Sequence, residues 1–317
     1  MIVSVVVITY NHAKYIRQCL DSILAQEVNF EYSIVVGDDA STDGTQDILR
    51  EYQQQFPVKF SLILNSQNEG ISKNYQNVLK QCRGKYVALC EGDDYWCDEL
   101  KLKRQVDFLE LHPNYGFVGS KCFKLFPYGQ LVLDNYDSNP SAPIENEWEL
   151  WGNAFDSAKY GPVTRTATIC FRKSLIESYL DIVGVGNDLV LQTILSKFSL
   201  FAKFHKPMAV FRVGQGVSTD ERNLKKELYY NEWYVQNRLL QKQLFPIDCP
   251  WDEDELKDRE DYIFLKDALK RFDYKEVCRR RKIIRTDIYR NKSYAKYSNS
   301  RFVAYGLGLL LRIRGKL

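Results

Sequence analysis

Histidine is scarce in this sequence, and the few histidines lie far apart: His12, His112 and His205. Zinc sites usually draw on histidine and cysteine ligands with close spacing. Cysteine supplies no such cluster either, because the 8 cysteines include no C-x-x-C pair. Any catalytic metal therefore has to be held by oxygen ligands, which Mg²⁺ and Mn²⁺ prefer.

Other absences narrow the class of protein. The run "SVVVITYNHAKY" carries no glycine-rich loop after its apolar part, as a dinucleotide-dependent oxidoreductase would require. The net charge is only +3, so we expect no nucleic-acid partner. No basic segment followed by an apolar region opens the chain, and the cysteines resemble reduced, buried thiols. These features predict a cytoplasmic protein.

Short apolar runs alternate with helical patterns over the first part of the chain. "IVSVVVITY", "YSIVV", "KFSLILN" and "KYVALC" have the composition of buried strands, and amphipathic segments such as "AKYIRQCLDSILAQ" lie between them. This order predicts an α/β fold with a Rossmann-like, mostly parallel sheet flanked by helices. Ligands of such sheets bind beyond the carboxyl ends of the strands, where "TYNHA", "GDDASTD", "NEG" and "EGDDYW" fall.

The rest of the chain changes character twice. Residues 125–161 mix Pro, Gly and Asn with large aromatics, which predicts loops, some of them over the active site. Beyond about residue 218, charged helical patterns predict a C-terminal α-helical extension. The final segment "RFVAYGLGLLLRIRGKL" is shorter than the roughly 20 apolar residues of a membrane span. It fits either a docked terminal helix or attachment to an anionic membrane surface.

The stretch "LCEGDDYWCDEL" gathers acids directly after an apolar strand. Positions i and i+2 of a strand end point the same way, so Glu91 and Asp93 are expected to face one polar site. Carboxylates there suit a divalent cation that is shared with a diphosphate. The alternative is that the acids cap the following helix, and spacing alone leaves both interpretations open.

A second polar turn, "GDDASTDGT", follows the strand "SIVV". Adjacent acids at a parallel strand end repel each other unless one of them finds a donor or a cation. Asp39 is therefore a candidate acceptor for a base N–H group, whereas Asp43 fits a helix cap.

These segments, together with "NEGISKN" and "NDLVLQTIL", resemble the successive motifs of family 2 inverting glycosyltransferases, which have the GT-A fold. The resemblance covers residues 1–218 and is specific in order and spacing. It implies a GT-A domain over 1–218, with a nucleotide-binding half (1–100) and an acceptor half (101–218), followed by the helical extension 219–317.

The resemblance implies roles for particular residues. Asp93, with Asp94 beside it, matches the metal-binding part of a DXD motif in which Glu91 replaces the usual first Asp. Asp188 matches the catalytic base, which takes the proton of the acceptor hydroxyl. The remaining nucleotide-sugar contacts implied are Thr9, Tyr10, Asn11, Asp39, Lys73, Glu91, Gly92, Asp93 and Arg212. Gly214 occupies a position where the family often has a histidine.

The expected function is metal-dependent, inverting transfer of a sugar from a nucleotide donor, with Mn²⁺ or Mg²⁺ as cofactor. The motifs favour a UDP-sugar as donor, and a glycan or lipid-linked oligosaccharide of surface polysaccharide synthesis as acceptor. Two alternatives stay open. One is a sugar-nucleotide nucleotidyltransferase, although no glycine-rich, basic phosphate loop occurs near the N-terminus. The other is an inactive sugar-nucleotide-binding scaffold.

Overall fold

Strand β1 (Val3–Thr9) has a buried side chain at each of its seven positions. Its β-branched residues suit a strand that is covered on both faces. β1 pairs in parallel with β2 (Tyr32–Asp38) on one side and with β4 (Tyr86–Leu89) on the other. The carboxyl ends of these strands therefore meet at one end of the sheet.

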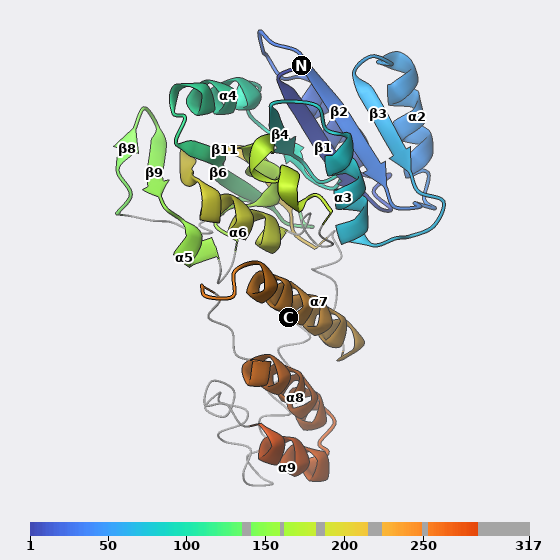
Figure 1. The fold of residues 1–317 in the computed structure, drawn as a ribbon. Helices are drawn as coiled ribbons and strands as arrows, with labels where there is room; N and C mark the ends of the chain where they lie inside the picture. Colours follow the sequence, from blue (N-terminus) through green and yellow to red (C-terminus); the bar gives the residue numbers. More distant parts are fainter. Residues whose placement is uncertain (135–140, 159–161, 182–187, 215–223, 249–252, 285–317) are drawn as a thin grey trace. The chain divides into compact units, whose positions relative to one another are not determined.

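The computed structural model describes residues 1–134, 141–158, 162–181, 188–214, 224–248 and 253–284. The chain divides into two units, residues 1–218 and 219–317, each of which is described by itself (Figure 1).

The sheet of the first unit has the strand order β3-β2-β1-β4-β10-β6-β11-β9-β8, and β5 and β7 pair with β11 and β6. The further strands are β3 (Phe60–Leu64), β5 (Tyr95–Trp96), β6 (Tyr115–Leu125), β7 (Leu131–Asp134), β8 (Ile144–Glu145), β9 (Trp148–Gly152), β10 (Cys170–Arg172) and β11 (Leu200–Arg212). β3, β2, β1 and β4 are parallel, as are β6 and β11, while β10 runs against both of its neighbours. The predicted α/β fold with a mostly parallel sheet is confirmed.

Helices pack against this sheet, and α3 and α6 lie on its near side in Figure 1. The helices of the first unit are α1 (Ile16–Leu24), α2 (Thr45–Gln55), α3 (Ile71–Gln81), α4 (Lys101–Leu111), α5 (Phe155–Ala158) and α6 (Asp188–Phe198). α1 buries Ile16, Cys19, Leu20 and Ile23, the spacing of one helix face. It begins later than the sequence pattern indicates because the His12 carbonyl accepts the amides of Tyr15 and Ile16 in a preceding turn.

The segment expected to form loops contains strands instead. β7 pairs with β6, and β8 and β9 form a hairpin whose two turn residues, Asn146 and Glu147, have φ values of 47° and 71°. Two-residue hairpin turns need positive φ at both positions, and glycine is the usual marker of such a turn. Because Glu147 stands where glycine is common, this hairpin gave no sequence signal.

The second unit is helical in its described part, with α7 (Leu224–Leu244), α8 (Glu253–Lys270) and α9 (Tyr274–Ile283). Apolar side chains of α8 and α9, among them Leu265, Leu269 and Val277, share a buried cluster. Among the described residues, no helix is both long and apolar enough to cross a membrane. The basic, apolar segment 301–317 lies outside the described residues, so its attachment to a membrane surface stays a prediction.

A lysine lies in the core of the first unit. Lys101 is 0% exposed, its Nζ donates to Gln105 Oε1 at 2.8 Å, and it lies 4.1 Å from the centre of the Trp96 ring. Burial disfavours its charged form and lowers the pKa of Lys101 to about 8.

Replacing Lys101 with Met should raise the free energy of unfolding at pH 7. The pKa of Lys101 is lower in the folded state than its unfolded value of about 10.4, so keeping the buried ammonium charged at neutral pH destabilises the folded state. This destabilisation fades as the pH rises from 8 to about 10.4. The penalty is about 3 kcal/mol, and loss of the Gln105 bond offsets about 1 kcal/mol of it. Urea unfolding should show a gain at pH 7 that vanishes near pH 10. Lys103→Met, on the exposed side of α4, is the control, and a gain independent of pH would contradict the assignment.

Candidate active site

Two loops at the carboxyl ends of β1 and β2 are bonded to each other. The backbone N–H of Asn11 donates to Ser41 Oγ at 2.8 Å, and Asn11 Oδ1 accepts the N–H of Thr42 at 2.9 Å. Asn11 has a φ of 55°, a left-handed conformation that asparagine tolerates better than most residues. The buried Thr9 and the exposed Tyr10 precede this turn, so an aromatic face is presented at the end of β1.

Asp39 is held by the loop after β3. Its Oδ1 accepts the N–H of Glu69 at 2.8 Å and the side-chain amide of Asn65 at 3.1 Å, while Oδ2 accepts the N–H of Gly70 at 2.9 Å. A carboxylate offers about four acceptor positions, so little capacity is left for a ligand. In this structure Asp39 organises the loop 65–70.

Lys73 lies in the first turn of α3, exposed, and forms no ion pair with a described residue. No side chain caps the start of this helix, which begins after Gly70. Free amides at a helix N-terminus attract anions, so Lys73 and these amides together offer positive charge.

The acidic loop after β4 approaches β1 closely at Gly92. A Cβ at this position would lie 2.8 Å from Thr9 Cβ and 3.0 Å from His12 Nδ1, closer than side-chain contacts normally allow. The Gly92 N–H donates to the Ile8 carbonyl at 2.9 Å. Asp93 is thereby brought beside His12, whose Nε2 lies 3.9 Å from Asp93 Oδ2.

The carboxyl groups of this loop share one environment with Asp188. Burial, then the charges of Asp93 and Asp188, raise the pKa of Glu91 to about 8. The pKa of Asp94 is raised well above its usual value, first by burial and then by Asp93 and Glu91. Crowded carboxylates gain from a cation beside them. Among the described residues, however, no three His, Cys, Asp or Glu side chains are grouped so that they could hold a metal ion by themselves.

Arg212, at the end of β11, holds the acidic loop in place. Its backbone N–H donates to Asp94 Oδ1 at 2.9 Å, and its guanidinium donates to the Asp93 carbonyl oxygen. The same guanidinium lies 4.8 Å from the ring centres of Tyr15 and Tyr95. The Asp94 carboxylate thus already accepts a backbone N–H. The Asp93 carboxylate forms no hydrogen bond with a described residue, so it is the more available of the two to bind a ligand. The next glycine, Gly214, has a φ of 87° and supplies no side chain.

Asp188 begins α6 and is partly buried. Its Oδ1 accepts the N–H of Leu189 at 2.7 Å, and the positive end of the helix dipole favours a carboxylate here. Burial raises the pKa of Asp188, while that hydrogen bond and the charge of Arg165 oppose the rise. A carboxyl whose proton affinity is raised in this way suits a general base.

Buried Gln192 ties α6 to the chain that precedes η1 (Thr166–Thr168). Its Oε1 accepts the N–H groups of Val163 at 2.8 Å and Thr164 at 3.1 Å, and its Nε2 donates to the Thr164 carbonyl at 3.0 Å. η1 in turn contacts β4 and β5, the strands on either side of the acidic loop. Gln192 therefore joins the helix of Asp188 to the chain that lies beside this loop.

Sequence reasoning missed two residues of this site. The scattered histidines give no reason to single out His12, and Tyr75 lies on an apolar helix face. Each of the two side chains has a buried polar atom, His12 Nδ1 and Tyr75 Oη, that finds no hydrogen-bond partner among the described residues. The only sequence signal was that His12 directly follows Tyr10 and Asn11.

Comparisons with known proteins point to one family. Residues 4–161 match the family model of glycosyl transferase family 2. An uncharacterized protein of Mycobacterium tuberculosis, Rv1520, is 48% identical over 110 residues, which cover 35% of this chain and 32% of that protein. The putative glycosyltransferase EpsE of Bacillus subtilis is 33% identical over 134 residues, which cover 42% of this chain and 45% of EpsE. The matches therefore span only about a third to a half of these relatives.

Solved structures show the same fold. TarS 1–349 of S. aureus, in complex with UDP-GlcNAc, has a TM-score of 0.54 and 18% identity, covering 99% of this chain and 92% of that one. The mannosyltransferase PcManGT of Pyrobaculum calidifontis, in complex with GDP-Man and Mn²⁺, has a TM-score of 0.51 and 17% identity, covering 97% and 86%. The sheet with acids at its carboxyl ends is thus a GT-A domain. The family match places the chain in glycosyl transferase family 2.

Replacing Asp39 with Asn should loosen the loop 65–70. An amide has one acceptor oxygen, so its NH₂ group would face a backbone N–H, at a cost of about 1–3 kcal/mol. We expect amide hydrogen exchange in this loop to become about 10-fold faster or more. Asp47→Asn, exposed on α2, is the control. Unchanged exchange in the Asp39 variant would show that these bonds do not hold the loop.

Proposed function

We propose that the chain is an inverting glycosyltransferase that moves a sugar from a nucleotide donor to a hydroxyl group of a glycan. The observation that carries the proposal is the convergence of Asp188 with Glu91 and Asp93, from separate parts of the sequence, at one end of the sheet. Family membership and the GT-A fold support the same conclusion.

The donor is a UDP-sugar in this proposal. Tyr10 is exposed for stacking on the base, with Thr9 and Asn11 beside it at the end of β1. Asp39 contributes by holding the loop that leads to Lys73, and Lys73 with the start of α3 meets the negative diphosphate. TarS, whose structure contains UDP-GlcNAc, supports this class of donor without fixing the sugar.

A divalent cation, Mn²⁺ or Mg²⁺, would be held by Asp93, with Asp94 and Glu91 nearby, and would neutralise charge on the departing diphosphate. Arg212 positions this loop through Asp94 and the Asp93 carbonyl. The structure of PcManGT with GDP-Man and Mn²⁺ supports a metal in this fold.

Asp188 acts as the general base. As the acceptor oxygen forms its bond to the anomeric carbon, the bond from that carbon to the phosphate oxygen breaks, and the hydroxyl proton passes to Asp188. The acceptor class we propose is a glycan or lipid-linked oligosaccharide of surface polysaccharide synthesis, at the cytoplasmic side of the membrane. The name of TuaG of Bacillus subtilis, a putative teichuronic acid biosynthesis glycosyltransferase, supports that class.

Replacing Asp188 with Asn should lower kcat by about 10²–10⁴-fold because the base is lost. Asn retains an oxygen for the Leu189 N–H, so the helix start and UDP affinity should be preserved. Transfer from a panel of UDP-sugars and UDP titration would measure the two effects. Asp181→Asn, at an exposed position, is the control, and wild-type turnover in the Asp188 variant would exclude this base.

Metal binding gives a separate test. Asp93→Asn should abolish saturable Mn²⁺ binding in the presence of UDP, measured by calorimetry, because an amide lacks the charge with which the Asp93 carboxylate would bind the ion. Excess EDTA should stop turnover of the unaltered protein. Glu99→Gln, exposed before α4, is the matched control. If turnover did not change in excess EDTA, the proposed divalent cation at Asp93 would be wrong.

A further inference from the structure

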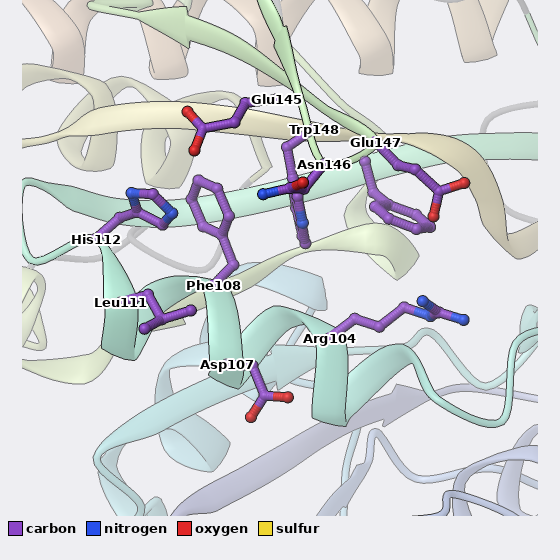
Figure 2. A pocket seen from close by; sticks show the side chains of 10 residues that line it. Arg104, Asp107, Phe108, Leu111, His112, Glu145, Asn146, Glu147 and Trp148 are labelled. Atoms are coloured by element: carbon purple, nitrogen blue, oxygen red, sulfur yellow. The ribbon is translucent and has the colours of Figure 1, made fainter.

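The cavity between the end of α4 and the β8–β9 hairpin is closed to ligands on its aromatic side. It has a volume of about 190 Å³, and Figure 2 shows the side chains that line it. Phe108, Trp148 and Phe204 form its apolar wall, but they are only 5%, 6% and 2% exposed and belong to the buried core. Their rings therefore offer no surface to a ligand.

Three polar groups without a hydrogen-bond partner lie elsewhere, beside the acidic loop after β4. Thr9 Oγ1 and His12 Nδ1 are buried and find no partner among the described residues. Asp93 is 8% exposed, and its carboxylate likewise forms no hydrogen bond with a described residue. Buried polar groups are normally hydrogen-bonded, so each such exception needs an explanation. Three exceptions at one place indicate that a ligand completes the site.

Gly92 allows these groups to come together. A Cβ at Gly92 would lie 2.8 Å from Thr9 Oγ1 and 3.0 Å from His12 Nδ1, so these two atoms border the same spot beside the glycine. The other ring nitrogen of His12, Nε2, lies 3.9 Å from Asp93 Oδ2. The imidazole therefore has Nδ1 on the side of the Thr9 hydroxyl and Nε2 on the side of the Asp93 carboxylate.

The distance between His12 Nε2 and Asp93 Oδ2 fits two ligands of one cation. It is too long for a hydrogen bond, which needs about 2.7–3.2 Å. A six-coordinate ion with bonds of about 2.1 Å holds neighbouring ligand atoms about 3 Å apart and opposite ones about 4.2 Å apart. The observed distance lies between these limits, so a small rotation of either side chain suffices. The two side chains are 15% and 11% exposed, so an ion can reach both.

The chemistry of this pair distinguishes Mn²⁺ from Mg²⁺. Imidazole nitrogen suits transition metals, whereas Mg²⁺ prefers the oxygens of carboxylates, carbonyls and water. Two protein ligands are enough, because an ion bound to a nucleoside diphosphate takes further oxygens from the phosphates and from water. The described residues contain no group of three His, Cys, Asp or Glu that could hold a metal alone, and this pair does not require one.

We propose that His12 binds the divalent cation through Nε2, together with Asp93, and makes the site selective for Mn²⁺ over Mg²⁺. The Nδ1–H group then donates to Thr9 Oγ1, since a histidine that binds a metal usually donates its other ring N–H to an oxygen. Both buried atoms that lack a partner gain one in this way. The inference rests on the proposed function, because it assigns a further residue to the cation of the transfer site.

Pulsed EPR of bound Mn²⁺ tests the assignment without any sugar transfer. The full chain, carrying ¹⁵N-labelled histidine, is loaded with Mn²⁺ and UDP, and a coupling between a histidine nitrogen and the ion is expected. His12→Gln should remove this coupling, because glutamine carries no label. His205→Ala, which changes an exposed histidine of β11, is the matched control and should leave the coupling unchanged.

Calorimetric titration in the presence of UDP measures the metal preference. The unaltered protein should bind Mn²⁺ about 10-fold more tightly than Mg²⁺. His12→Gln, which replaces the nitrogen ligand by an amide, should weaken Mn²⁺ binding about 10-fold and change Mg²⁺ binding less than about 3-fold. Thr9→Val, which keeps the shape and removes the hydroxyl, should also weaken Mn²⁺ binding about 10-fold. UDP binding without metal shows that each variant is folded.

The outcomes separate this inference from the proposed function. If Mn²⁺ binds but no histidine coupling appears, or if the coupling survives in His12→Gln, His12 is not a ligand and only this inference is overturned. An unchanged preference for Mn²⁺ in His12→Gln overturns it as well. If neither ion binds saturably, both this inference and the proposed cation at Asp93 are wrong.

Discussion

The site depends on keeping several carboxyl groups together at one end of a buried sheet. Glu91 has its pKa raised to about 8 by burial and by the charges of Asp93 and Asp188. Such repulsion would push the side chains apart unless the backbone fixes them. Gly92 allows the acidic loop to approach β1 where any Cβ would clash, and Arg212 anchors it from β11. The backbone therefore keeps these carboxyl groups close together at the end of the sheet, and the proposed divalent cation would relieve their repulsion.

The loops beside these acids carry conformational strain of their own. Asn11 and Ala40 have φ values of 55° and 63°, and Ala40 lacks the local hydrogen bonding that helps asparagine adopt this region. The N–H of Asn11 donates to Ser41 and its side-chain oxygen accepts from Thr42, so the two turns support each other. Strain held by surrounding bonds is typical of functional sites, and here it leaves Tyr10 exposed at the strand end.

The parallel strands and the loops at their carboxyl ends could be predicted because apolar runs and helical patterns alternate and are separated by clearly polar loops. The role of each residue within these loops could not be predicted. Asp39 binds backbone amides of a loop some 30 residues away, and Arg212 is occupied by the acidic loop, contacts that only the folded chain creates. His12 and the hairpin turn at Asn146 escaped prediction for a similar reason, since neither carries a distinctive local pattern.

Strand β11 links the acidic loop to the rest of the sheet. It pairs with β6 and, over its first half, with β9, and Arg212 at its end holds the acidic loop. The pairing with β6 shifts register between Phe204 and Pro207 and again between Pro207 and Ala209. Such irregularities bend a strand and change the direction of the side chains that follow. The position of Arg212 therefore depends on an irregular stretch of β11, which a simple alternation of apolar and polar residues would not have placed correctly.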